Sequence, residues 1–141
     1  MKLDEFSIGD VFETKPYSLT EEDVKKFASE FDPQYMHLDH EKANQGMFQG
    51  IIASGIHTLA LSFKLWVEEG KYGDDVIAGT KMEAVKFIKP VYPTDILSVR
   101  AEVINKKVLN DEQGLLTVLL STFNDKNIKV YQAELTALIK R

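Results

Sequence analysis

The chain has 141 residues, of which 44% are hydrophobic and 28% charged, and its net charge is −5 at pH 7. This length is that of one ordinary domain, and the composition is typical of a globular protein that can bury a core. The acidic net charge argues against nucleic acid as the main partner, because phosphate binding needs a clustered basic surface. The absence of cysteine excludes disulfides, zinc–thiolate sites and thiol nucleophiles. We therefore expect one domain spanning residues 1–141 and no nucleic-acid partner.

The N-terminal sequence MKLDEFSIGD lacks the apolar segment of a secretory signal. No run of about 18 apolar residues, the length that could cross a membrane, occurs in the chain. From these two features we expect a cytoplasmic protein that does not associate with a membrane.

The first elements in chain order are a strand and a short helix. The stretch DVFETKPYSL is β-prone and contains a proline that suits an edge strand or a bulge. Thr20 is a typical N-cap, and Asp23 stands where a capping box places its acidic residue, so a helix is predicted to begin there. Pro33 ends this helix because the residue before a proline is driven out of the helical conformation. Asp32 consequently lies at a forced chain reversal.

A long apolar helix follows a mostly irregular segment at residues 38–53. Apolar residues recur with helical spacing over residues 56–67, and Gly70 ends the pattern. Leu61 and Leu65 widen the apolar arc beyond one stripe. A helix that is apolar over so much of its surface is predicted to be buried.

The second half of the chain predicts four long strands in a meander, because the hydrophobic period changes to two after Gly73. In ILSVRAEVINKKV, for example, Leu97, Val99, Ala101 and Val103 face one way. With the N-terminal strand these give an α+β fold, in which a curled antiparallel sheet of about five strands wraps around the one long helix. This is the hotdog arrangement. An exposed sheet edge invites a second copy of the chain, so a homodimer or an assembly of dimers is expected.

Asp32 and His37 are the first candidate for chemistry. The short segment between them can bring a carboxylate and an imidazole toward one point, where they could handle the two protons of a water molecule. A plainer alternative is that Asp32 caps a turn and His37 packs against its neighbours.

Ser54 and Gly55 are the second candidate. The first backbone N–H groups of a helix have no internal partner and carry the positive end of its dipole. Glycine lets a ligand approach the backbone closely, so this position could stabilise a thioester oxygen that becomes negative. The alternative is that Ser54 is an ordinary N-cap.

Other polar residues give weaker signals. His40 lies three residues after His37, but a metal site needs three converging ligands and His57 is not favourably placed, so no metal is expected. Thr58 and Ser62 could line a pocket, although hydroxyls on a helix usually bond to their own backbone. Five basic residues of the predicted strands are expected on solvated strand faces, although one or two could contact the phosphates of a bound cofactor: Lys86, Lys89, Arg100, Lys106 and Lys107.

The stretch FDPQYMHLD, followed by GIIASGIHT, resembles the MaoC-like dehydratases, the family that includes the (R)-specific enoyl-CoA hydratases. The signature of that family is D-x-N-P-x-H, followed by a small residue and a glycine that lead into the central hotdog helix. VKFIKPVYPTDILSV is similar to the strand motif F-x-x-P-V-x-x-G-D of the same family. The resemblance covers nearly the whole chain in order and spacing.

The resemblance implies catalytic roles for Asp32 and His37 and an oxyanion hole at the N–H of Gly55. Gln34 stands where the hydratases have asparagine, and Tyr35 stands where they have proline. Because these two departures flank the pair, the resemblance does not fix its fine geometry or its substrate choice, but it leaves the acid/base pair in place. Thr94 replaces the usual glycine of the strand motif. We expect the substrate to contact Gln34, Ser54, Met47, Phe48 and Ile51.

The implied reaction is addition of water to a 2-enoyl thioester, or its reversal, with acyl-CoA as the substrate and no separate cofactor. Two alternatives remain. A hotdog acyl-CoA thioesterase would use an acid on or near the central helix, where the only acids, Glu68 and Glu69, fall at the far end. A MaoC-type domain could instead bind acyl-CoA without catalysis, as a regulatory subunit.

Overall fold

The computed structural model describes all 141 residues and contains a six-stranded sheet in which every pairing is antiparallel. The strands are β1 (Val11–Glu13), β2 (Tyr17–Ser18), β3 (Val76–Phe87), β4 (Ile96–Val108), β5 (Gln113–Phe123) and β6 (Lys129–Lys140). They follow the order β1-β4-β5-β6-β3, and β2 pairs with a separate part of β4. The sheet therefore has β3 as one edge.

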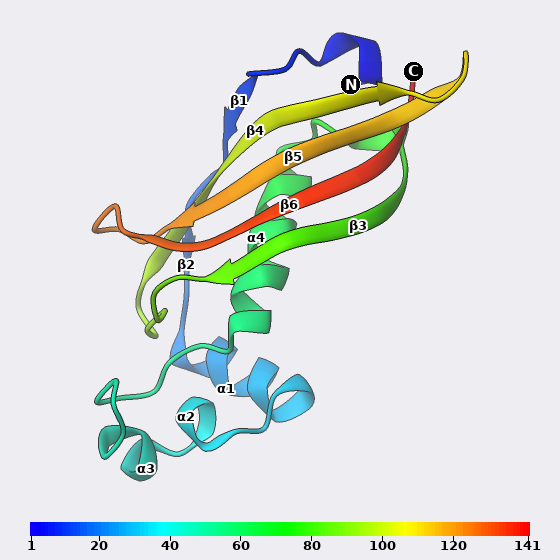
Figure 1. Ribbon diagram of the computed structural model, residues 1–141. Coiled ribbons are helices and arrows are strands. Elements are labelled where there is room, and N and C mark those ends of the chain that lie inside the picture. Colours follow the sequence, from blue (N-terminus) through cyan, green and yellow to red (C-terminus); the bar gives the residue numbers. More distant parts are fainter.

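Four α-helices and two 3₁₀ turns complete the chain. They are α1 (Glu21–Phe31), α2 (Tyr35–Leu38), α3 (His40–Asn44), α4 (Gly55–Glu68), η1 (Leu3–Glu5) and η2 (Gly73–Asp75). Figure 1 shows α4 lying against one face of the curved sheet, with α1, α2 and α3 gathered near its N-terminal end. This is the hotdog arrangement that the sequence predicts. None of the helices is both long and apolar enough to span a membrane.

The core lies between α4 and the sheet. The four residues of β4 that were predicted to share a face are all buried: Leu97, Val99, Ala101 and Val103. Trp66 of α4 is 1% exposed, and its ring centroid lies 5.8 Å from that of Phe12 of β1. This packing holds α4 against the sheet, and so holds its N-terminus in position.

The prediction that α4 is buried around most of its surface is wrong for the single chain. The buried residues of α4 are Thr58, Leu61, Ser62, Leu65 and Trp66. Ile56, Phe63 and Val67, which belong to the predicted apolar stripe, are 52%, 43% and 42% exposed. The reason is that the sheet covers only one side of the helix, as Figure 1 shows.

The predicted meander of four strands is also wrong, because only β4, β5 and β6 follow one another in the sheet. β3 lies beyond β6 and pairs with it. The segment that joins β3 to β4 does not form a tight hairpin. Instead, Val91 accepts a hydrogen bond from the N–H of Ala53, and the N–H of Thr94 donates to Leu19.

The N-terminal predictions hold with one change of detail. The predicted first strand is two short strands, β1 and β2, on either side of Pro16. Thr20 caps α1 as predicted: its hydroxyl accepts from the N–H of Asp23, and the Asp23 carboxylate accepts from the N–H of Thr20. α1 ends at Phe31, two residues before Pro33, so Asp32 takes the C-cap position.

Candidate active site

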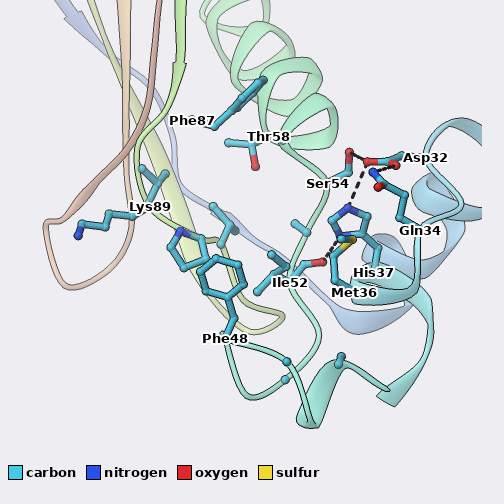
Figure 2. A pocket seen from close by; sticks show the side chains of 18 of the residues that line it. Asp32, Gln34, Met36, His37, Phe48, Ile52, Ser54, Thr58, Phe87 and Lys89 are labelled. Carbon is cyan, nitrogen blue, oxygen red and sulfur yellow. Dashed lines mark hydrogen bonds and ion pairs between the residues drawn. The ribbon is translucent and has the colours of Figure 1, made fainter. Parts of the chain in front are cut away.

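Asp32 leaves α1 at the point where the chain reverses, and its carboxylate is held by three side chains. Ser54 Oγ donates to Asp32 Oδ2 at 2.6 Å, and Gln34 Nε2 donates to Asp32 Oδ1 at 2.6 Å. His37 Nε2 lies 3.1 Å from Asp32 Oδ2. The sequence places Ser54 22 residues away from Asp32, so the fold, not local sequence, forms this cluster (Figure 2).

His37 lies on α2 and is 5% exposed. Its Nδ1 lies 2.6 Å from the backbone carbonyl oxygen of Ile52. A carbonyl oxygen can only accept a hydrogen bond, so Nδ1 carries a proton and donates it. A histidine with a single proton would therefore have a lone pair on Nε2, the nitrogen that faces Asp32.

Hydrogen bonding holds the pKa of the Asp32 carboxyl below its usual range. The bond from Ser54 is the largest cause, with further lowering by the Gln34 amide and by His37, while burial acts in the opposite direction. Donors that contact a carboxylate stabilise its charged form. Asp32 is therefore a carboxylate at neutral pH and can act as a base.

The N-terminus of α4 lies directly beside this pair. Ser54 occupies the N-cap position, but its side chain makes no capping hydrogen bond, because the hydroxyl donates to Asp32 instead. Within the chain, no acceptor bonds to the N–H of Gly55 or Ile56. A Cβ on Gly55 would stand 2.8 Å from the ring of Phe87, so only glycine fits here without displacing that ring. The site thus combines a carboxylate, an imidazole and free helix N–H groups.

A cavity of about 630 Å³ opens over these groups. Asp32, Gln34, His37, Ser54 and Gly55 all line it, as do two of the predicted acyl-contacting residues, Met47 and Phe48. Much of the remaining wall is apolar and comes from Met36, Ile52, Phe87, Ile88, Pro90, Val91 and Val130. Figure 2 shows the acid/base cluster on one side of the cavity and Lys89 on the other.

Ile51 is the one predicted site residue that does not line the cavity. It is 4% exposed and belongs to the hydrophobic core, while its neighbour Ile52 lines the cavity. Consecutive residues of an extended segment point to opposite sides. In a segment without a regular period, the sequence does not reveal which of the two isoleucines faces the ligand.

The other two histidines lie away from the pair. His40 Nε2 is 2.6 Å from Glu21 Oε1 at an exposed position. His57 stacks on Phe27 with a ring-centroid distance of 4.5 Å, and burial lowers its pKa. No group of three histidine, aspartate or glutamate side chains that could hold a metal ion is present.

The family model described as the MaoC like domain matches residues 5–123. The chain belongs to this family. The Bacillus subtilis protein YdeM is 62% identical over 141 residues, and the match covers 100% of this chain and 100% of that protein. The MaoC-like dehydratase from Rhodospirillum rubrum is 29% identical with a TM-score of 0.93, over 100% of this chain and 97% of that one. The R-hydratase PhaJ1 from Pseudomonas aeruginosa, 24% identical with a TM-score of 0.79 over 98% and 84%, has the same fold.

This MaoC-like domain differs from the family motif at Thr94, and the backbone shows why glycine is usual there. Thr94 has a φ of 81°, in the left-handed region that glycine adopts without strain and that a β-branched residue rarely adopts. Its N–H bonds to Leu19, which holds the turn in place. The departure therefore affects a turn outside the cavity lining and not the acid/base pair.

Three features of this MaoC-like site were not predicted from the sequence: the carbonyl of Ile52, the bond from Ser54 to Asp32, and the position of Phe87 over Gly55. Each depends on a contact between segments far apart in the chain. A partial signal existed for one of them, because glycine after a cap residue indicates close packing at a helix start. The identity of the packed ring could not be read from that signal.

Proposed function

We propose that the protein is a hydro-lyase that adds water to a 2-enoyl-CoA thioester, or removes it from a 3-hydroxyacyl-CoA thioester, as an (R)-specific enoyl-CoA hydratase does. The carrying observation is the 3.1 Å contact between Asp32 and His37 beside the free N–H groups of α4, in one cavity. A carboxylate and an imidazole together can handle both protons of a hydration. Membership of the MaoC-like dehydratase family supports a hydro-lyase.

The geometry favours one assignment of the two proton transfers to Asp32 and His37. Because Nδ1 of His37 donates to Ile52, a proton must lie between Nε2 and the Asp32 carboxylate for their contact to be attractive. In hydration, Asp32 accepts a proton from water as the water oxygen bonds to C3, and His37 gives its Nε2 proton to C2. The proton on Asp32 then passes to Nε2, which restores the pair. Dehydration follows the same steps in reverse.

The N-terminus of α4 stabilises the charge that develops between these two transfers. As the C3–O bond forms, electrons move toward the thioester oxygen, which becomes enolate-like. The N–H of Gly55 and the positive end of the helix dipole can stabilise that oxygen. Gly55 has no side chain of its own to cover this N–H, and the ring of Phe87 packs where a Cβ would stand.

The rest of the cavity suits an acyl-CoA molecule. Met47 and Phe48 and the apolar wall provide surface for an acyl chain. Lys89 is the only lysine or arginine that lines the cavity, and it makes no ion pair within the chain, so its ammonium group is available to a phosphate of CoA. Coenzyme A would then be part of the substrate, and the proposed chemistry requires no separate cofactor.

We also propose that the protein works as a homodimer joined through β3 and the exposed side of α4. β3 is an edge strand, and Ile56, Phe63 and Val67 of α4 leave apolar surface uncovered nearby. An exposed edge strand next to apolar surface is a typical site of pairing between chains. Sedimentation should give twice the 16.0 kDa chain mass, and Phe63→Glu should give the single chain mass. A wild-type monomer would contradict the proposal.

The main test is hydration of crotonyl-CoA and of longer enoyl-CoA thioesters, followed as loss of the conjugated absorbance. Asp32→Asn and His37→Ala should each lower kcat at least about a hundredfold, the lower end for a general acid or base. His40→Ala is the matched control, because His40 lies outside the cavity and should leave the rate unchanged.

Two other outcomes would indicate a different function. Release of free CoA thiol without hydration would indicate a thioesterase. Tight acyl-CoA binding without turnover would indicate a binding or regulatory subunit, if Asp32→Asn and His37→Ala leave the affinity for acyl-CoA unchanged.

A further inference from the structure

Gln34 lies between Asp32 and His37 in the chain and bonds to both of them. Its backbone N–H donates to the Asp32 carbonyl oxygen at 2.8 Å, and its own carbonyl accepts from the N–H of His37 at 3.1 Å. Its side-chain Nε2 donates to Asp32 Oδ1 at 2.6 Å. Gln34 is thus the one residue that contacts the backbone of both members of the pair and the carboxylate of one.

The side chain of Gln34 is not used for helix capping. Gln34 occupies the N-cap position of α2, and its side chain makes no capping hydrogen bond. The amide instead contacts the one carboxylate oxygen of Asp32 that neither His37 nor Ser54 reaches. The two oxygens therefore have separate partners: Oδ2 faces His37, and Oδ1 is held by Gln34 (Figure 2).

We propose that Gln34 is a positioning residue for the proposed hydration: by holding Oδ1 it fixes the rotation of the Asp32 carboxylate so that Oδ2 stays against His37 and keeps its negative charge. The inference rests on the proposed function for its catalytic readout. Without the amide, the carboxylate could turn about its Cβ–Cγ bond, and water would replace a fixed donor. Charge-assisted hydrogen bonds of this kind are stronger than neutral ones, so the effect should be measurable even at an exposed residue.

Few charged groups lie near Asp32, so a shift in the pH dependence of the rate can be assigned to it and its partners. His37 is the only titratable side chain in direct contact with Asp32. Tyr35 and Lys89 line the same cavity. A change in the acid limb of the pH–rate profile after a substitution at Gln34 therefore reports on the pair.

Gln34→Leu should lower kcat roughly tenfold with little change in KM, since the lost bond positions a catalytic group and not the substrate. The acid limb of the profile should move to higher pH, because a carboxylate without its donor is protonated more easily. Gln34→Glu should move that limb further, because a second negative charge lies against Asp32. Gln45→Leu, an exposed glutamine outside the cavity, is the matched control.

A rise in KM with kcat and the acid limb unchanged would overturn the proposal and make Gln34 a substrate-contacting residue. Unchanged kinetics in both variants would also overturn it. The role of Gln34 can be tested independently of the proposed hydratase activity, by an NMR titration of the Asp32 carboxyl carbon in the free protein. Gln34→Leu should move that titration to higher pH whether or not the wild-type protein hydrates enoyl-CoA, and an unmoved titration would refute the inference.

Discussion

Two helices of this protein begin with a hydroxyl residue, and the two hydroxyls do different things. Thr20 caps α1 in the usual way, by accepting from the N–H of Asp23. Ser54 stands at the same position of α4 but donates to Asp32, and it leaves the first N–H groups of its own helix without a side-chain partner. The first arrangement stabilises a helix. The second keeps helix N–H groups free for a ligand and stabilises the partly exposed carboxylate of Asp32.

Helix α4 can begin without a side-chain cap because packing supports it. Its buried side, which includes Leu65 and Trp66, lies against the sheet, whereas α1 buries only Val24 and Ala28. In proteins, most helical stability comes from such tertiary packing. In this protein, the well-packed helix is therefore the one whose N-terminus can stay uncapped at the candidate site.

The largest expected effect that tests this comparison is at Ser54. Ser54→Ala should lower kcat for enoyl-CoA hydration roughly 10- to 100-fold, because a charge-assisted hydrogen bond to the catalytic carboxylate is lost. The acid limb of the pH–rate profile should move to higher pH, because the Ser54 bond is the main cause of the low pKa of Asp32. Thr20→Ala, measured in the same assay, should match the wild type. Equal losses at the two positions would remove the distinction between the two caps.

The smallest expected effect concerns stability. Thr20→Ala should lower the free energy of unfolding by about 1 kcal/mol, the usual value for a lost N-cap, measured by urea denaturation. Its kcat should be unaffected, since Thr20 does not line the cavity. A destabilised variant with a catalytic defect as large as that of Ser54→Ala would show that α1 has a catalytic role beyond carrying Asp32.

The parts of the structure that depend on local sequence were predicted well. The capping box of α1, its end before Pro33 and the inward face of β4 follow from interactions within a few residues or from a strict period of two. The proximity of Asp32 and His37 belongs to the same class, because only four residues separate them. These features require no knowledge of the remainder of the fold.

The predictions that failed depend on long-range packing. β3 was placed next to β4 because it precedes β4 in the chain, but its partner β6 lies some fifty residues further on. Ile51 was chosen over Ile52 in a segment with no period to decide between them. The exposed side of α4 looked buried because the sequence shows how apolar a helix is, but not how much of it one chain can cover.

The segment from Ile52 to Gly55 has a consequence for how this site can change over evolution. Within four consecutive residues it provides the carbonyl that accepts from His37 Nδ1, the hydroxyl that holds Asp32 and the free helix N–H. The effects of substitutions there should be non-additive, since neighbouring residues that act on the same Asp32–His37 pair are coupled. Met47 and Phe48, by contrast, lie in an exposed loop that makes none of these contacts. Acyl preference can therefore diversify through that loop while the reaction itself is conserved.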